Sequence, residues 1–151
     1  MKFIILMEKD NSMKRVFTCG VFDYFHLGHL RLLKQAKEHG DYLIVAVMNG
    51  DCVKMYKPDQ SLFYSTEERM EMVSSLKVVD EVIEYQHMNV DTIGKLGVDF
   101  DVYCLGEDHI GERWDKVAQW CLDHGKEVVR LKRTPNISST ELRADVKERL
   151  V

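Results

Sequence analysis

The 151-residue sequence has no hydrophobic run long enough to cross a membrane. The apolar run within residues 1–7 is also too short for a secretory signal peptide. Repeats, low-complexity segments and an interdomain linker are missing too, so we expect one domain over residues 13–151 and no membrane insertion. Residues 1–12 form an extension that could be an added strand, a disordered leader or the product of an upstream start codon.

The sequence also lacks any C-x-x-C pair. Its four cysteines are single residues at positions 19, 52, 104 and 121. Such spacing does not suit a zinc or thiol-exchange motif. We interpret the cysteines as reduced, buried thiols of a cytoplasmic protein.

An excess of basic residues is absent as well. The 21 Lys and Arg residues face 25 Asp and Glu residues, for a net charge of −4. Sequence-independent nucleic-acid binding needs a basic face, so we expect no nucleic-acid partner. An acidic protein can still bind an anion where a few basic groups converge on one cleft.

Apolar runs that are typical of buried strands alternate with helical patterns along the chain. Strands are expected at 15–18, 42–48, 80–85, 101–105 and 127–131, and helices at about 30–39, 65–76, 90–96 and 114–122 and from 138 onward. Residues 49–64 are expected to form a long loop. The alternation predicts an α/β fold with a parallel sheet and right-handed crossovers.

The first strand, turn and helix contain the residues most suggestive of chemistry. Gly20, Asp23 and Gly28 suit a tight backbone reversal between strand and helix. A helix that starts after such a turn offers free N–H groups and a positive dipole end to an anion. His26 and His29, three residues apart, fall on one side of the first helical turn.

Other interpretations of His26 and His29 are solvated surface residues, caps for loop carbonyls, or zinc ligands. The pair has no nearby Cys, and no Glu at the spacing of zinc proteases. Its place at the carboxyl end of the first strand favours ligand binding, because open α/β sheets bind ligands there.

Two motifs resemble those of a known family. Residues 20–29 resemble the G-x-F-D…H-x-G-H signature of the cytidylyltransferase branch of the nucleotidyltransferase superfamily. Residues 133–140 resemble the R-T-x-x-I-S-[ST]-T motif of that branch, and its glycerol-3-phosphate cytidylyltransferases are the most similar group. The resemblance implies a Rossmann-like three-layer sandwich whose five-stranded parallel sheet has the order 3-2-1-4-5.

The resemblance also implies an activity, namely transfer of CMP from CTP to a small phosphorylated alcohol, with release of pyrophosphate, for cell-surface polymer synthesis. It implies a homodimer, and Mg²⁺ held near Asp23. The implied catalytic residues are His26, His29, Arg69 and Arg133. The implied nucleotide-binding residues are Cys19, Gly20, Val21, Phe22, Asp23, His26, His29, Lys57, Gly106, Glu107, Asp108, Arg133, Thr134, Ile137, Ser138, Ser139 and Thr140.

Four residues are candidates for binding the phosphorylated alcohol, namely Lys54, Lys57, Lys77 and His109. Lys77 and His109 stand where the resembled enzymes usually have arginine and tryptophan. The two lysines of the 49–64 loop and Arg69 could equally be ordinary solvated residues. Trp114 and Trp120 are expected to pack in the core rather than to stack on a base.

Because Lys77 and His109 depart from the family pattern, the sequence does not determine which phosphorylated alcohol is the acceptor. Another polyol phosphate, phosphoethanolamine or phosphocholine remains an alternative to glycerol 3-phosphate. An adenylyltransferase and a non-catalytic nucleotide-binding module are the alternatives outside this class.

Overall fold

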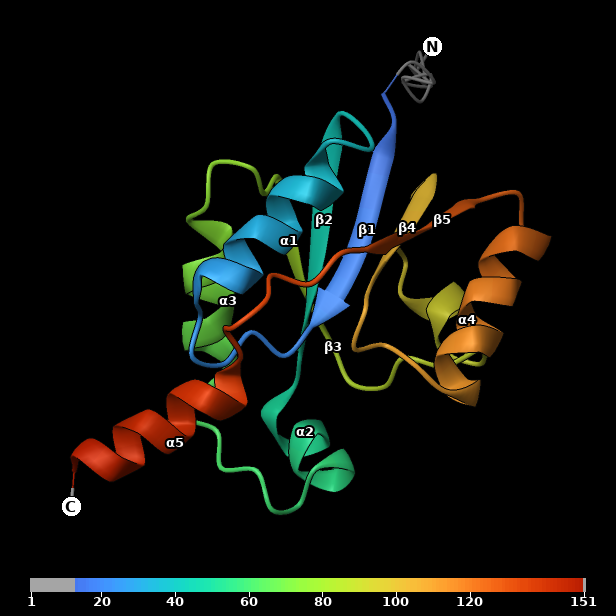
Figure 1. The fold of residues 1–151 in the computed structure, drawn as a ribbon. Coiled ribbons are helices and arrows are strands. Elements are labelled where there is room, and N and C mark those ends of the chain that lie inside the picture. Colours follow the sequence, from blue (N-terminus) through green and yellow to red (C-terminus); the bar gives the residue numbers. More distant parts are fainter. Residues whose placement is uncertain (1–12, 151) are drawn as a thin grey trace, which may run out of the picture.

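A computed structural model describes residues 13–150, and the expectation for residues 1–12 lies outside this part of the chain. Its centre is a five-stranded parallel sheet with the order β3-β2-β1-β4-β5, as expected (Figure 1). The strands are β1 (Arg15–Gly20), β2 (Tyr42–Met48), β3 (Glu81–Tyr85), β4 (Val102–Gly106) and β5 (Glu127–Leu131). The order reverses between β1 and β4, which places a crevice at their carboxyl ends.

The central strands are apolar on both faces because both faces are covered. Every residue of β4 is buried, and β2 is buried from Leu43 to Met48. β1 pairs along its whole length with β2 and through Val16–Thr18 with β4. The Thr18 hydroxyl donates a 2.9 Å hydrogen bond to the Cys104 carbonyl, which satisfies the one polar side chain in the middle of β1.

Helices cover the two faces of the sheet (Figure 1). α1 (Leu27–Lys37) and α3 (Thr66–Ser74) pack on one face, where Leu33, Ala36 and Val73 are buried. α4 (Glu112–Asp123), the 3₁₀ turn η1 (Ile93–Lys95) and α2 (Gly50–Tyr56) pack on the other face. The three-layer sandwich is therefore confirmed.

α2 corrects the expected loop over residues 49–64. Asn49 caps this helix, because its side-chain oxygen accepts hydrogen bonds from the backbone N–H groups of Asp51 and Cys52. Cys52 and Val53 are then buried against the sheet. The Asn-Gly-Asp sequence at 49–51 indicates a turn, but here it starts a helix, which burial of its apolar face stabilises.

Two smaller differences concern η1 and α4. Residues 90–96 form only the 3₁₀ turn η1, and Leu122, expected on the apolar face of α4, is 53% exposed. All four cysteines are free and buried, as expected. Within residues 13–150, no helix combines the length and the apolar character needed to span a bilayer.

The last helix, α5 (Ser139–Arg149), extends away from the sheet (Figure 1). None of its residues is buried. It joins the rest of the molecule at its first turns, and these turns border the crevice.

Candidate active site

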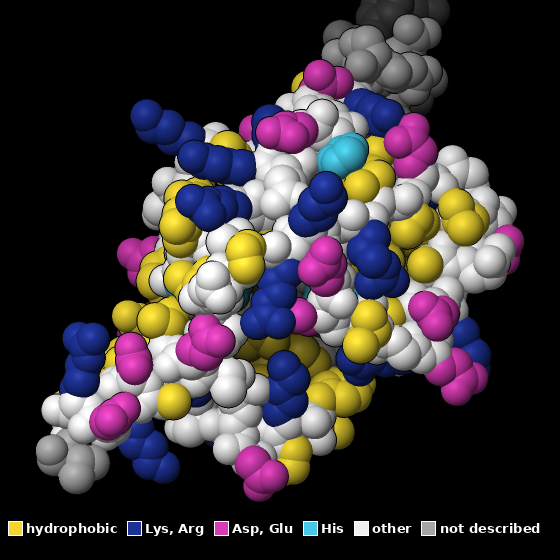
Figure 2. Space-filling model, in the orientation of Figure 1, with side chains coloured by type: hydrophobic (Ala, Val, Ile, Leu, Met, Phe, Trp, Pro, Cys, Tyr) yellow, Lys and Arg dark blue, Asp and Glu magenta, His cyan; other side chains and the backbone are white. Residues whose placement is uncertain are grey.

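A cavity of about 560 Å³ opens at the carboxyl ends of the strands. Cys19, Met48, Tyr85 and Gly106, at the ends of β1 to β4, lie on its wall. In Figure 2 the corresponding side of the molecule is hollowed, with hydrophobic side chains inside and Lys and Arg side chains around the hollow. Apolar walls with a basic rim suit a ligand that carries both a base and phosphates.

Every residue predicted to bind nucleotide lines this cavity. The residues come from the end of β1 and the β1–α1 turn, from the C-terminal end of α2, from the end of β4 and the turn after it, and from the segment between β5 and α5 with the first residues of α5. Segments more than a hundred residues apart in the sequence therefore meet at one place, as the two motifs implied.

His26 and His29 are held in a fixed arrangement at the start of α1. Nδ1 of His26, the N-cap residue, accepts a 3.0 Å hydrogen bond from the Gly28 N–H. Nδ1 of His29 accepts a 3.2 Å hydrogen bond from the His26 N–H, and the two rings stack with centroids 3.9 Å apart. A nitrogen that accepts cannot carry the proton, so the proton of each neutral ring is on Nε2.

Burial keeps both rings neutral. It lowers the pKa of His29 to about 3, and it lowers the pKa of His26, where the positive charge of Arg133 acts in the same direction. Two neutral imidazoles with fixed tautomers offer two Nε2–H donors on the cavity wall. Such donors can stabilise negative charge that grows on an oxygen.

Gly28 makes this arrangement sterically feasible. A Cβ atom at position 28 would lie 2.7 Å from Cε1 and 2.9 Å from Nδ1 of His26. The ring of His26 therefore folds over a position that only glycine leaves open.

Arg133 and the N-terminus of α5 line the same cavity as the histidines. Arg133 lines the cavity, and within residues 13–150 its one polar contact is a long 3.4 Å approach to Asp108. Ser138 caps α5 by accepting from the Glu141 N–H, and the Ser139 hydroxyl donates to the Asp23 carbonyl at 2.9 Å. The start of α5 is thus tied to the start of α1, and both helix N-termini meet at one cavity.

The comparisons with known proteins identify the family. Residues 17–145 match the model of the family described as cytidylyltransferase-like. The chain belongs to the cytidylyltransferase-like family. It is therefore a nucleotidyltransferase, as the sequence motifs predicted.

Relatives of this cytidylyltransferase-like protein differ in name. A glycerol-3-phosphate cytidylyltransferase of Staphylococcus aureus is 39% identical over 136 residues, which cover 89% of this chain and 96% of that one. An FAD synthase of Thermococcus kodakarensis is 35% identical over 127 residues, covering 83% and 84%. A lipopolysaccharide core biosynthesis protein from Thermoplasma volcanium has a TM-score of 0.63 and 29% identity, covering 81% and 97%.

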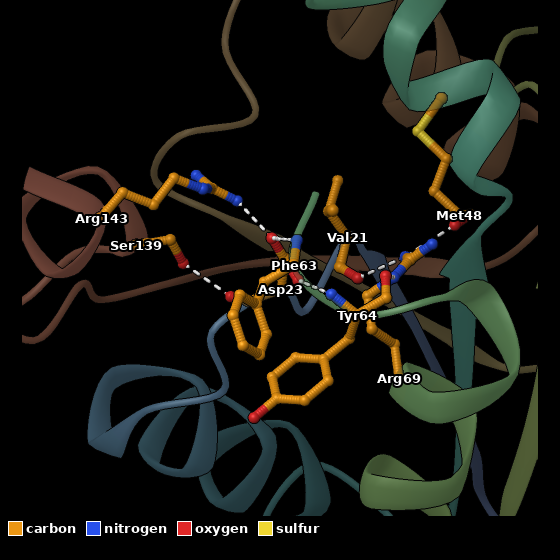
Figure 3. Close-up of polar contacts among 8 residues, drawn as sticks. All are labelled: Val21, Asp23, Met48, Phe63, Tyr64, Arg69, Ser139 and Arg143. Atoms are coloured by element: carbon orange, nitrogen blue, oxygen red, sulfur yellow. Dashed lines mark hydrogen bonds and ion pairs between the residues drawn. The ribbon is translucent and has the colours of Figure 1, made fainter. Parts of the chain in front are cut away.

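Asp23 occupies a different environment from the one expected for a Mg²⁺ ligand. Its carboxylate accepts hydrogen bonds from the N–H groups of Phe63 and Tyr64 at 3.0 and 3.1 Å, and it pairs with Arg143 at 2.7 Å (Figure 3). The described residues contain no group of three or more His, Cys, Asp or Glu that could hold a metal ion. These donors do not fit a metal ligand, so we assign no metal to Asp23; it fixes the turn before α1.

The expected role of Arg69 in the reaction needs correction. This side chain is fully buried, and it is not part of the cavity wall. Its Nη1 atom donates 2.8 Å hydrogen bonds to the carbonyls of Val21 and Met48 (Figure 3). Nε and Nη2 donate to the Tyr64 carbonyl and the Thr66 hydroxyl. Arg69 is thus a positioning residue for the segments that form the cavity.

Two of the four residues expected to bind the acceptor lie elsewhere. Lys54 is exposed on α2 and does not line the cavity. Lys77 is exposed in the turn between α3 and β3, at the amino end of the strands. α3 runs antiparallel to the strands, so its C-terminal end lies at the edge of the sheet opposite the crevice. Lys77 follows that end, which explains why the prediction for it was wrong. Lys57 and His109 do line the cavity.

His109 has an unusual environment. Its ring stacks on that of Trp114 with centroids 4.1 Å apart, and its buried Nδ1 atom has no hydrogen-bond partner among the described residues. Burial lowers the pKa of His109 to about 4, against the opposing effect of Asp108. Trp114 belongs to the core, as expected, and also lines the cavity; Trp120 stacks on His124 outside it.

Sequence reasoning missed several residues of the cavity wall. Arg143 pairs with Asp23, and Tyr56 and Arg113 come from α2 and α4. A signal for Arg143 existed, because it follows Ser139 by four residues and so lies on the same side of α5. The sequence offers no comparable signal for the other two.

Proposed function

We propose that this enzyme transfers CMP from CTP to a small phosphorylated alcohol, with glycerol 3-phosphate as the favoured acceptor. The pair of stacked, neutral histidines in a basic cavity is the observation that carries the proposal. The identity to a protein named glycerol-3-phosphate cytidylyltransferase supports the choice of substrates.

The proposed reaction needs no covalent enzyme intermediate. A phosphate oxygen of the acceptor attacks the α-phosphorus of CTP and forms a new P–O bond. The bond from the α-phosphorus to the bridging oxygen breaks, and pyrophosphate leaves with the electron pair. The attacking oxygen already carries a negative charge, so no base has to remove a proton from it.

The chain's contribution is then binding and charge stabilisation. The Nε2–H groups of His26 and His29 are placed to donate to oxygens of the α-phosphate as their charge grows. Arg133, Ser139, Thr140 and the N-terminus of α5 lie on the same wall and suit the β- and γ-phosphates. Gly106, Glu107 and Asp108 are then left to face the cytosine and ribose.

Further properties belong to the same proposal. We propose cytoplasmic action, which fits four free thiols, and a CDP-alcohol product used for a cell-surface polymer such as teichoic acid or capsule. We also propose a homodimer and a requirement for Mg²⁺ that accompanies the nucleotide and does not depend on Asp23. The relative named FAD synthase makes adenylyl transfer the alternative to test.

The experiment is a matrix of nucleotides and acceptors. The purified protein is incubated with CTP, ATP, GTP or UTP and with glycerol 3-phosphate, longer polyol phosphates, phosphoethanolamine or phosphocholine. Pyrophosphate release is measured, and the product is identified by ³¹P NMR. We expect turnover with CTP and a polyol phosphate. Absence of turnover with CTP and every acceptor would contradict the proposal.

A further inference from the structure

Arg113 lies on the cavity wall at the start of α4. Its guanidinium is 4.6 Å from the centre of the Tyr56 ring and 4.7 Å from the centre of the Trp114 ring. An arginine in contact with two aromatic faces keeps a defined orientation while its N–H donors stay available. Arg113 is therefore placed as a rigid, planar cation at the cavity.

The Tyr56 ring is itself held in place. Its hydroxyl is 2.9 Å from Nδ1 of His87, in the segment that follows β3. Trp114 is buried and stacks on His109. Both aromatic neighbours of Arg113 are thus fixed by contacts of their own.

Other arginines around the cavity have protein partners. Arg143 pairs with Asp23, Arg133 contacts Asp108, and Arg130 donates to the carbonyls of Gly106 and His109. For Arg113, residues 13–150 supply ring contacts but no hydrogen bond or ion pair. A half-buried cation without a counter-ion is costly to keep, and an anionic ligand removes that cost.

Its position separates Arg113 from the proposed triphosphate site. α2 and α4, which carry Tyr56 and Arg113, pack on one face of the sheet, and α1 packs on the other (Figure 1). Arg113 lines the same cavity as Cys19 and Tyr85, which lie at the ends of β1 and β3. The proposed triphosphate contacts come from the start of α1, the start of α5 and the segment between β5 and α5.

In-line transfer requires the nucleophile and the leaving pyrophosphate on opposite sides of the α-phosphorus. A cation on the α4 side of the histidines therefore suits the attacking group, and one on the α5 side suits pyrophosphate. We propose that Arg113 binds the phosphate group of the acceptor and, with the aromatic pair around it, makes a phosphate monoester the required substrate. This inference rests on the proposed function for the reaction, but phosphate binding can be measured separately.

The test compares three variants, namely Arg113→Gln, Arg113→Lys and the control Arg31→Gln. Arg31 is exposed on α1 and does not line the cavity. Arg31→Gln therefore removes the same charge from the protein without changing the cavity. We expect Arg113→Gln to raise KM for the acceptor at least about thirtyfold and to leave KM for CTP within about twofold. Arg113→Lys keeps the charge but loses the planar guanidinium, so its KM for the acceptor is expected to lie between those of the wild type and Arg113→Gln.

Direct binding makes the two proposals distinguishable. Calorimetry with glycerol 3-phosphate, inorganic phosphate and glycerol, alone and with CMP present, uses no turnover. We expect the wild type and Arg31→Gln to bind the phosphates but not glycerol, and Arg113→Gln to bind glycerol 3-phosphate at least about thirtyfold more weakly than the wild type. Phosphate binding without any nucleotidyl transfer would overturn the proposed function and leave this inference standing.

Two results overturn the assignment of Arg113. One is a normal acceptor KM and normal phosphate binding in a folded Arg113→Gln protein. The other is a rise in KM for CTP with the acceptor KM unchanged, which would make Arg113 a nucleotide residue. Absence of phosphate binding by the wild type, with and without CMP, also contradicts the proposal. Circular dichroism and Arg113→Lys guard against loss of folding as the cause.

Discussion

The Asp23 carboxylate and the Arg143 guanidinium lie 2.7 Å apart, although 120 residues separate them in the sequence. The pair joins the turn before α1 to α5, which has no buried residue of its own. Arg143 also lies over the Tyr24 ring at 5.0 Å, in the same turn. One arginine thus attaches the last helix to the segment that positions the histidines.

Replacing Arg143 by Met should destabilise the protein because it leaves the Asp23 charge buried without its partner. Breaking a buried pair from one side typically costs about 3 kcal/mol of unfolding free energy. Arg149→Met is the matched control, because Arg149 and its partner Asp145 are both exposed and lie 3.9 Å apart. This variant should lose at most about 0.5 kcal/mol of unfolding free energy. Urea unfolding measures both, and equal losses in the two variants would contradict a structural role for the Asp23–Arg143 pair.

His26→Ala and His29→Ala should each lower kcat by at least about a hundredfold, because each removes one preorganised donor to the transition state. KM for CTP should change much less. His124→Ala is the control, since this histidine is exposed and stacks on Trp120 outside the cavity. Steady-state kinetics of the folded variants tests the roles, and full activity in either cavity variant refutes that residue's assignment.

The lowered pKa of His29 predicts how stability depends on pH. Its ordinary value is 6.5 and the folded value is about 3, so the unfolded state binds more protons between these limits. The contribution of His29 is complete above about pH 6.5 and is lost as the pH falls toward 3. Urea unfolding from pH 7 to 4.5 should show a steeper loss in the wild type than in His29→Gln, by at most about 1.4 kcal/mol per pH unit. Parallel slopes would mean that His29 titrates normally.

The proposed homodimer predicts a mass of about twice the chain. Cyclic pairs are the commonest assembly of soluble proteins, and the resembled enzymes are expected to share it. Light scattering at micromolar concentration measures the mass directly. A species of 17.6 kDa alone contradicts the dimer.

The elements that sequence predicted well are those with local causes. Continuous apolar runs mark β2 and β4 because both faces of a central parallel strand are covered. The capping box at Ser65 and Glu68 marks the start of α3, and both of its hydrogen bonds form. The strand–turn–helix at His26 likewise carries its own signal, so the site was located from a short stretch of residues.

The errors concern residues whose environment is set by distant segments. Arg69 resembles a solvated or phosphate-binding arginine in sequence, but carbonyls from two strand ends and a loop take up its donors. Asp23 resembles a free carboxylate until Arg143, on the last helix, pairs with it. A local sequence pattern carries no information on partners from distant segments. A resemblance that assigns a role to each residue separately does not identify these partners either.

The choice of nucleotide tests the central claim most directly. Initial rates of pyrophosphate release are compared for CTP and ATP, each with glycerol 3-phosphate under identical conditions. A site whose buried polar groups match the cytosine edge leaves those groups unpaired with another base, so we expect kcat/KM for CTP to exceed that for ATP by at least about a thousandfold. Comparable rates with the two nucleotides, or a preference for ATP, would contradict the account.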